Sequence, residues 1–223
     1  MKLTYSVVIA SDRVDKPLPV LDGLKKLPAS ERPKEIFVCG GKNPSRQRNL
    51  GVAQCKSPVI YFLDDDSVVA PGTVHDLLSH FEDPRTAVAG GPNLVPPDAI
   101  SFEKTVNAVL ASRMGSSSVR FRYAAIGSVK EATEKDLILC NMMVRRETFL
   151  GEGGFRTDLY PNEENEFLNR LLHKAPGWFT THAGLFTVPA AKASGPSATR
   201  LSATAAAAPT RSRSILACPT SST

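Results

Sequence analysis

Residues 58–66 read Pro-Val-Ile-Tyr-Phe-Leu-Asp-Asp-Asp, a short apolar run that ends in three carboxylates. The run is rich in β-branched and aromatic residues, and its length suits a buried strand of a mostly parallel sheet. Ligands of such sheets bind beyond the carboxyl ends of the strands, where Asp64, Asp65 and Asp66 are expected. Three acids there repel one another unless a cation offsets their charge, and Mg²⁺ or Mn²⁺ commonly joins carboxylates to phosphates. The stretch therefore predicts a metal–phosphate site, with a solvated acidic turn as the alternative.

Strand and helix patterns alternate on both sides of this run. Strands are expected at 5–10, 35–39, 59–63 and 86–89, and helices at 18–27, 43–55 and 71–81. Asn43-Pro44 combines an N-cap residue with proline at the first helical position, which is typical of a helix start. Alternating strands and helices imply an α/β fold, in which right-handed crossovers build a mostly parallel central sheet flanked by helices.

The second half of the chain has a different character. We expect a helix at 100–113, a mobile loop at 114–135, a strand at 137–144, a short helix at 145–150, a turn at 151–154 and a helix from 162 or 163. One domain is predicted over 1–186, with a nucleotide-binding half at 1–91 and a catalytic, acceptor-binding half at 92–186. In residues 187–223, Ala, Ser, Thr and Pro account for 27 of 37 positions, so this tail is predicted to be disordered.

Composition narrows the class of partner. The chain has 223 residues and a formal net charge of +5, but residues 167–223 hold six Lys or Arg and no acid. Residues 1–166 therefore carry 21 basic and 22 acidic side chains, so the charge gives no support for a nucleic-acid partner. No apolar run approaches the roughly 20 residues that span a bilayer, and no signal peptide is recognisable, which makes the cytoplasm the expected location.

Four motifs occur in a fixed order along the chain. They are Arg48-Asn49-Leu50-Gly51, Phe62-Leu63-Asp64-Asp65-Asp66, Gly153-Gly154-Phe155, and the segment 163–171 that runs from Glu163-Glu164 to Arg170-Leu171. Together they resemble the large bacterial family 2 of inverting GT-A glycosyltransferases over residues 5–175. Members of that family use nucleotide-diphosphate sugars to build surface polysaccharides and related glycans of the cell envelope.

The resemblance implies a role for each residue on the donor side. The acidic triplet is similar to the family's Asp-x-Asp motif, so Asp66 would bind Mn²⁺ or Mg²⁺ and Asp64 would contact the ribose or assist the metal. Asp65 would join them in binding the donor, and Ala10 and Ser11, at the end of the first strand, would touch the nucleotide. Arg48 would brace the nucleotide or pair with the triplet, although a solvated helix face is the alternative for it.

The acidic pair Glu163-Glu164 is similar to the family's catalytic pair. Glu164 aligns with the base that takes the proton of the acceptor hydroxyl, and Glu163 is its neighbour. The alternative is that acids in the first turn of a helix complement its dipole, and both interpretations can hold together. The turn at Gly153-Gly154 would bring backbone close to the sugar. Arg170 is expected to form an ion pair within the domain, and Trp178 to pack.

The implied partners are a nucleotide-diphosphate sugar and a glycan or lipid-linked acceptor, with peripheral contact to the inner face of the plasma membrane. Three departures from the family pattern stand out. The second strand ends in Val38-Cys39-Gly40-Gly41, without the usual aspartate, and the loop after it is short. The tail departs as well, because its composition is typical of a GC-rich gene read out of frame from about 174–177.

Two other functions are open on sequence alone. One is an inactive, truncated glycosyltransferase remnant that acts as a binding module. The other is a sugar-nucleotide nucleotidyltransferase, which would have a glycine-rich basic loop directly after the first strand. The chain has Ser11-Asp12-Arg13-Val14 at that place, without glycine.

Overall fold

The computed structural model describes residues 3–96, 99–125, 128–174, 179–183 and 215–217. The first half alternates as predicted, with β1 (Tyr5–Ser11), α1 (Pro19–Lys26), β2 (Glu35–Gly40), α2 (Pro44–Gln54), β3 (Val59–Asp64), α3 (Thr73–Ser79), η1 (His80–Glu82) and β4 (Val88–Gly90). The second half holds α4 (Ser101–Ala111), α5 (Arg113–Ser116), η2 (Ser117–Arg122), β5 (Ser128–Glu131), η3 (Leu139–Asn141), β6 (Met142–Arg145), α6 (Arg146–Gly151), α7 (Glu163–Lys174), β7 (Phe179–Ala183) and β8 (Ile215–Ala217).

The described strands form one sheet in the order β5-β7-β4-β6-β3-β1-β2-β8. Strand β1 pairs in parallel with both β2 and β3, so Ala10 lies opposite Asp64 at the carboxyl ends of the two strands. Strand β6 runs antiparallel between β3 and β4, an insertion that the simple alternation of strands and helices did not predict. The acidic triplet therefore lies where β1 and β3 end together, as expected.

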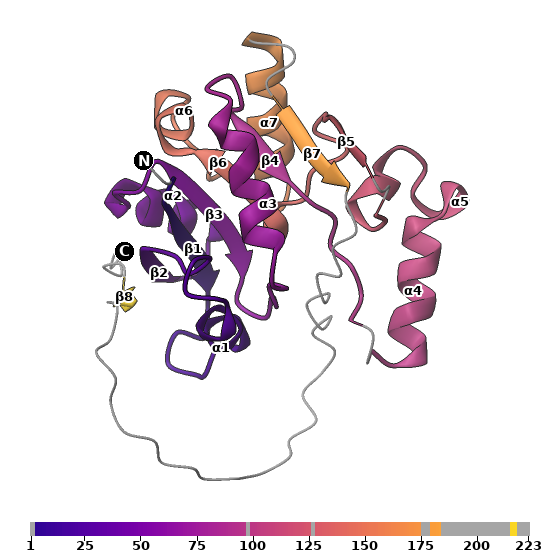
Figure 1. Ribbon diagram of the computed structural model, residues 1–223, viewed down its shortest axis with the longest axis horizontal. Coiled ribbons are helices and arrows are strands. Elements are labelled where there is room, and N and C mark those ends of the chain that lie inside the picture. Colours follow the sequence, from indigo (N-terminus) through magenta and orange to yellow (C-terminus); the bar gives the residue numbers. More distant parts are fainter. Residues whose placement is uncertain (1–2, 97–98, 126–127, 175–178, 184–214, 218–223) are drawn as a thin grey trace, which may run out of the picture.

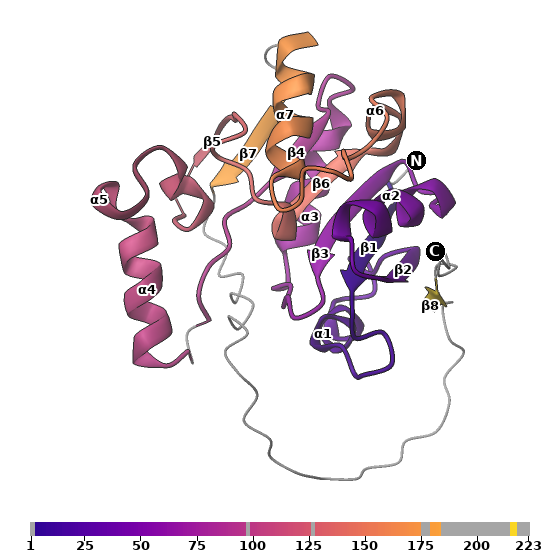
Figure 2. The same cartoon turned by 180° about the vertical axis from the view of Figure 1, so that it is seen from behind.

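Helices cover both faces of this sheet, as the two views in Figures 1 and 2 show. Alternate residues of β1 and β3 point to opposite faces, so Val8 and Phe62 join one buried cluster while Ile9 and Tyr61 join the other. The first cluster includes Phe149, Phe155 and Phe167, and the second includes Leu24, Val74, Leu77 and Phe81. Burial on both faces explains why the strands read as continuous apolar runs.

Gly51 allows α2 to lie close to the sheet. A Cβ atom at this position would lie 2.6 Å from Val8 Cγ1 and 3.0 Å from Cys39 Sγ. Contacts that short are not sterically tolerated, so any larger residue would push α2 outward. The glycine of the Arg48-Asn49-Leu50-Gly51 motif thus sets the position of the arginine and asparagine that precede it.

Several element predictions for the second half were wrong or only partly right. The predicted strand 137–144 is confirmed only at 142–144, in β6, and its earlier part holds the 3₁₀ turn η3, where the buried Asn141 side chain accepts from Tyr61 Oη and donates to the Pro92 carbonyl. The predicted loop 114–135 contains α5, η2 and β5. Within the predicted disordered tail, Ile215–Ala217 instead form β8 beside β2. The other residues of 187–223 lie outside the described residues, as does most of the proposed break at 174–177.

No helix among the described residues combines the length and the apolar character needed to cross a membrane.

Candidate functional site

A cavity of about 770 Å³ opens at the carboxyl ends of β1 and β3. It brings together every residue predicted for the donor side. Its lining consists of Ala10, Ser11, Asp12, Arg13, Gly41, Lys42, Pro44, Gln47, Arg48, Asp64, Asp65, Asp66 and Tyr160. The sequence interpretation missed Arg13, Lys42, Gln47 and Tyr160 as lining residues, because only the fold brings these separate parts of the chain together.

Asp65 is held on both of its carboxylate oxygens. The Ser11 hydroxyl donates to Asp65 Oδ2 over 2.6 Å, and Arg13 Nη2 donates to Asp65 Oδ1 over 2.7 Å. Arg13 Nε donates to Oδ2 as well, over 3.3 Å, which makes the arginine contact bidentate. Asp65 therefore ties the end of β1 to the end of β3, and the Arg13 guanidinium offsets its charge.

Arg48 joins the acidic triplet, predicted to bind the metal and the donor, to the predicted catalytic pair Glu163-Glu164. Its Nη2 donates to Asp64 Oδ1 over 3.1 Å, and its Nη1 donates to Glu163 Oε1 over 2.9 Å. The arginine is 7% exposed and Glu163 is 1% exposed. The alternative of a solvated helix face for Arg48 is therefore wrong, and the predicted pairing with the triplet is present. The guanidinium also reaches α7, which the sequence did not indicate.

The surroundings of the other two acids of the triplet, Asp64 and Asp66, disfavour their ionised forms. Burial raises the pKa of Asp64, and the nearby Arg48 guanidinium opposes this shift. Burial also raises the pKa of Asp66, and the charges of Asp64 and Asp65 raise it further. A bound cation would relieve this repulsion, so the donor set fits a hard divalent metal. Among the described residues, however, no three His, Cys, Asp or Glu side chains are grouped to hold a metal by themselves.

Glu163 and Glu164 begin α7, but their surroundings differ. Glu163 Oε1 accepts from Arg48, while its buried Oε2 has no hydrogen-bond partner among the described residues. Glu164 is half-buried, and burial together with the charge of Glu163 raises its pKa. The adjacent Asn165 accepts from Arg122 of η2, which also donates to the backbone carbonyls of residues 134 and 135. Glu164 is thus the carboxylate of the pair that remains accessible.

The Gly153-Gly154-Phe155 turn connects two helices that carry predicted site residues, α2 and α7. Gly154 has φ +71°, and a Cβ there would lie 2.7 Å from Asn49 Oδ1. The Asn49 amide donates to the Phe155 carbonyl and accepts from the Phe155 N–H, over 2.7 and 2.9 Å. Phe155 packs against Phe62, Phe149 and Phe167 with ring centroids 4.9–5.4 Å apart. The turn therefore locks α2 against α7.

Arg170 forms the predicted ion pair within the domain. It pairs with Glu166 over 2.9 Å and donates to the Gly154 carbonyl over 2.8 Å. This contact anchors the glycine turn to α7 and gives Glu166 a structural partner. Trp178 lies outside the described residues.

The end of β2 differs from the family pattern in the way the sequence indicated. Gly40 and Gly41 occupy the place where the family has an aspartate. Gly41 has φ +149°, a backbone conformation that residues with a side chain rarely adopt. Gln47 fills the space beside them by donating to the carbonyls of Ser11 and Cys39. The charged residue that follows these glycines and lines the cavity is a base, Lys42, and not an acid.

The fold is of the GT-A type, as two solved structures show. S. aureus TarS 1–349 in complex with UDP-GlcNAc aligns with a TM-score of 0.61 at 14% identity, over 86% of this chain and 60% of that chain. The mannosyltransferase PcManGT from Pyrobaculum calidifontis, in complex with GDP-Man and Mn²⁺, aligns with a TM-score of 0.54 at 12% identity, over 82% and 57% of the two chains.

The sequence assigns the family. Glycosyl transferase family 2 matches residues 2–150, and the chain belongs to this family. The pre-mycofactocin glycosyltransferase of Mycobacterium tuberculosis is 27% identical over 131 residues, which are 59% of this chain and 27% of that protein. The chain spans less than half the length of the curated relatives it matches.

Proposed function

We propose that this chain is a glycosyltransferase domain that moves a sugar from a nucleotide-diphosphate donor to an acceptor hydroxyl in one inverting displacement. The observation that carries the proposal is the Arg48 bridge between Asp64 and Glu163. This bridge joins the acids expected to hold the donor to the acids expected to activate the acceptor. A relative named as a glycosyltransferase, and structural neighbours solved with UDP-GlcNAc or with GDP-Man and Mn²⁺, support the same class of reaction.

The donor would lie over the carboxyl ends of β1 to β3. A cavity of about 770 Å³ is within the range of roughly 300–1,000 Å³ that small-molecule and cofactor sites occupy. Ala10 and Ser11 would contact the nucleotide, while Asp66, assisted by Asp64, would hold Mn²⁺ or Mg²⁺ against the diphosphate. When bound, the metal supplies a positive charge that stabilises the leaving nucleoside diphosphate. Arg48 and the Asp65–Arg13 pair would hold the acids in place.

Glu164 would act as the general base. Inversion requires one group to remove the acceptor proton on the side opposite the leaving diphosphate. The raised pKa of Glu164 makes the ionised carboxylate a stronger base than an exposed glutamate, while Glu163 is committed to Arg48. The acceptor would be a glycan or a lipid-linked hydroxyl, and it would have to reach Glu164 beyond the donor cavity, whose lining includes neither Glu163 nor Glu164.

Donor binding tests the proposal first. The melting temperature of the purified chain would be measured with UDP, GDP, dTDP and CDP, each with and without Mn²⁺. We expect a metal-dependent rise for one nucleotide, and its loss in Asp66→Ala. A folded protein that shows no rise with any nucleotide would refute the donor site. A rise without any release of the nucleoside diphosphate from the matching sugar nucleotide, by transfer to water or to an added acceptor, would instead favour a binding module.

A further inference from the structure

Arg13 is an exposed cation in the lining of the donor cavity. It follows the end of β1, and its side chain is 45% exposed. Its Nε and Nη2 donate to the two carboxylate oxygens of Asp65, and its backbone N–H donates to the Ser11 hydroxyl over 3.0 Å. That hydroxyl in turn donates to Asp65. The contacts form a closed ring of hydrogen bonds, which fixes the place of the guanidinium.

Part of the Arg13 guanidinium is left over by these contacts. Arginine has five N–H groups, and the contacts to Asp65 use the one on Nε and one of the two on Nη2. Among the described residues, Nη1 of Arg13 makes no hydrogen bond. The second N–H of Nη2 and both N–H groups of Nη1 are therefore available to a ligand that enters the cavity.

Two other cations are among the described residues that line the cavity, and both are less suited to a ligand at the acidic triplet. Arg48 is 7% exposed and already pairs with Asp64 and Glu163. Lys42 follows β2, which lies on the far side of β1 from β3 in the sheet. Arg13 follows β1, the strand that pairs directly with β3. Arg13 thus combines available N–H groups with a place beside the triplet.

The position of Arg13 suits an anionic ligand that binds together with a metal. Its partner Asp65 stands between Asp64 and Asp66 in the sequence, and these two acids are the ones proposed to hold the metal. Mg²⁺ and Mn²⁺ commonly join one or two carboxylates to the phosphates of a substrate. The phosphates of a donor on that metal would therefore lie beside the guanidinium.

We propose that Arg13 is a phosphate-binding residue of the donor site and that Asp65 is the positioning residue that orients it. The available N–H groups of Arg13 would donate to oxygens of the diphosphate, which the planar guanidinium can contact in pairs. Asp65 would then act through Arg13 instead of binding the donor itself. This inference rests on the proposed function and gives the donor site a residue that the sequence did not indicate.

Calorimetry on the full chain with Mn²⁺ tests the role of Arg13. The probes are UDP, GDP, dTDP and CDP, and the one that binds most tightly is compared with its own nucleoside, which has no phosphate. We expect Arg13→Gln to weaken binding of the diphosphate about ten- to a hundredfold and to leave binding of the nucleoside unchanged. A loop that is merely loosened would weaken binding of both ligands equally.

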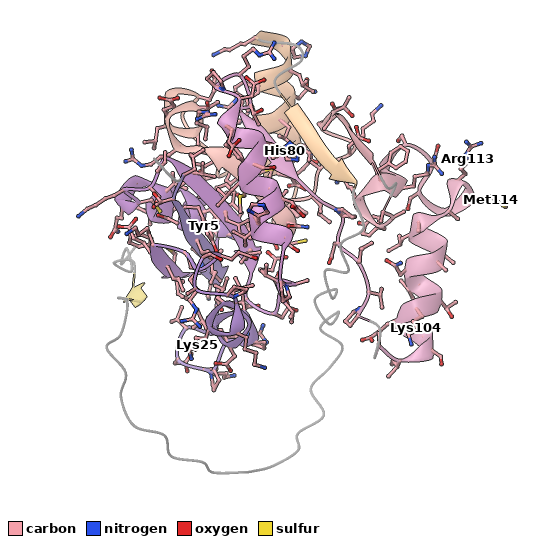
Figure 3. All side chains as sticks on the ribbon, in the orientation of Figure 1. Tyr5, Lys25, His80, Lys104, Arg113 and Met114 are labelled. Carbon is pink, nitrogen blue, oxygen red and sulfur yellow. The ribbon has the colours of Figure 1, made fainter. Side chains whose placement is uncertain are left out.

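Lys25→Gln is the matched control. Lys25 lies on α1 (Figure 3), where it forms an exposed pair with an aspartate, Asp22, over 3.0 Å, and it does not line the cavity. The control removes one positive charge from an ion pair, as Arg13→Gln does, and it should bind the diphosphate as the wild type does.

A second pair of variants separates a contact with phosphate from a simple balance of charge. Arg13→Gln leaves the Asp65 carboxylate without its cation, and that charge alone would repel a diphosphate. Arg13→Gln combined with Asp65→Asn removes both charges, and we expect its affinity for the diphosphate to stay at least about tenfold below that of the wild type. Asp65→Asn alone keeps the guanidinium but loosens it, so its affinity should fall between those of the wild type and the double variant.

Three results would overturn the inference. They are a diphosphate affinity that Arg13→Gln leaves unchanged, an equal loss for diphosphate and nucleoside, and wild-type affinity in the double variant. The melting temperature without nucleotide checks that each variant is folded, and in Arg13→Gln the Ser11 hydroxyl can still donate to Asp65. If the wild type itself binds no nucleotide, the donor site and this inference both fail, whereas the three results above leave the donor site intact.

Discussion

Replacing Arg48 with methionine should destabilise the protein more than any surface substitution. Methionine keeps much of the length of the arginine stem but removes the guanidinium. Glu163 would then carry a carboxylate that is 1% exposed and has no partner in the part of the chain that the structure describes, because its Oε2 already has none there. The side chain of Asp64 is 45% exposed, so water would take the place of its lost contact. The cost of the substitution therefore lies with Glu163.

The magnitude follows from this burial. Removing one partner of a buried ion pair costs about 3–5 kcal/mol, because it strands the other charge in a low dielectric. For a chain of this size each kcal/mol lowers the melting temperature by about 2–4 °C, so a fall of roughly 6–20 °C is expected. Urea unfolding followed by circular dichroism would measure the free energy, and a thermal scan would measure the temperature.

Two companion variants sharpen the test of Arg48. Arg85→Met removes an arginine of similar size from its exposed pair with Asp83, and it should leave stability unchanged within error. Arg48→Met combined with Glu163→Leu removes both buried charges and should recover more than half of the loss. A loss below about 1 kcal/mol for Arg48→Met, or no recovery in the double variant, would refute the reasoning, since either result means that Glu163 is not stranded.

Three further predictions concern the site. Asp66→Asn removes a carboxylate whose charge is disfavoured at neutral pH, so it should raise the melting temperature slightly while it abolishes the Mn²⁺-dependent response to nucleotide; a lower melting temperature would contradict this. Folding raises the pKa of Glu164, so turnover should begin to fall on acidification at a pH above the ordinary glutamate pKa. The stability that is linked to Glu164 has the opposite pH dependence. It is fully present below the pKa of Glu164 in the unfolded chain and is lost as pH rises through the pKa in the folded protein. A pH–rate profile and pH-dependent melting would check both signs. Gly154→Ala forces a Cβ to 2.7 Å from Asn49 Oδ1 at φ +71° and should cost at least about 1–2 kcal/mol in urea unfolding, whereas Gly151→Ala, where a Cβ meets nothing within 4 Å, should be tolerated.

The fold was predictable where the pattern was local. Strands β1 to β3 are buried on both faces, and their continuous apolar runs mark them in the sequence. Parallel pairing then fixes the acidic triplet at one edge of the sheet. The antiparallel β6 could not be foreseen, because its place depends on the buried Asn141, whose partners Tyr61 and Pro92 lie about 80 and 49 residues away along the chain.

The site was predictable in its residues more than in its connections. Asp64, Asp66 and Glu164 belong to motifs, and they lie where β3 ends and α7 begins. The Arg48 bridge from Asp64 to Glu163 depends on a contact across 115 residues, which no local pattern contains. Arg13 was missed for the same reason, because only the fold brings it to Asp65.

The most direct test of the proposed function compares Glu164→Gln with Asp66→Ala. Binding of the sugar nucleotide would be measured by calorimetry with Mn²⁺, and release of the nucleoside diphosphate would be followed in the same samples. We expect Glu164→Gln to bind the donor as the wild type does and to release the nucleoside diphosphate about 10²–10⁴-fold more slowly, and Asp66→Ala to lose binding. Wild-type release by Glu164→Gln, or undiminished metal-dependent binding by Asp66→Ala, would contradict the assignment of the base and of the metal site.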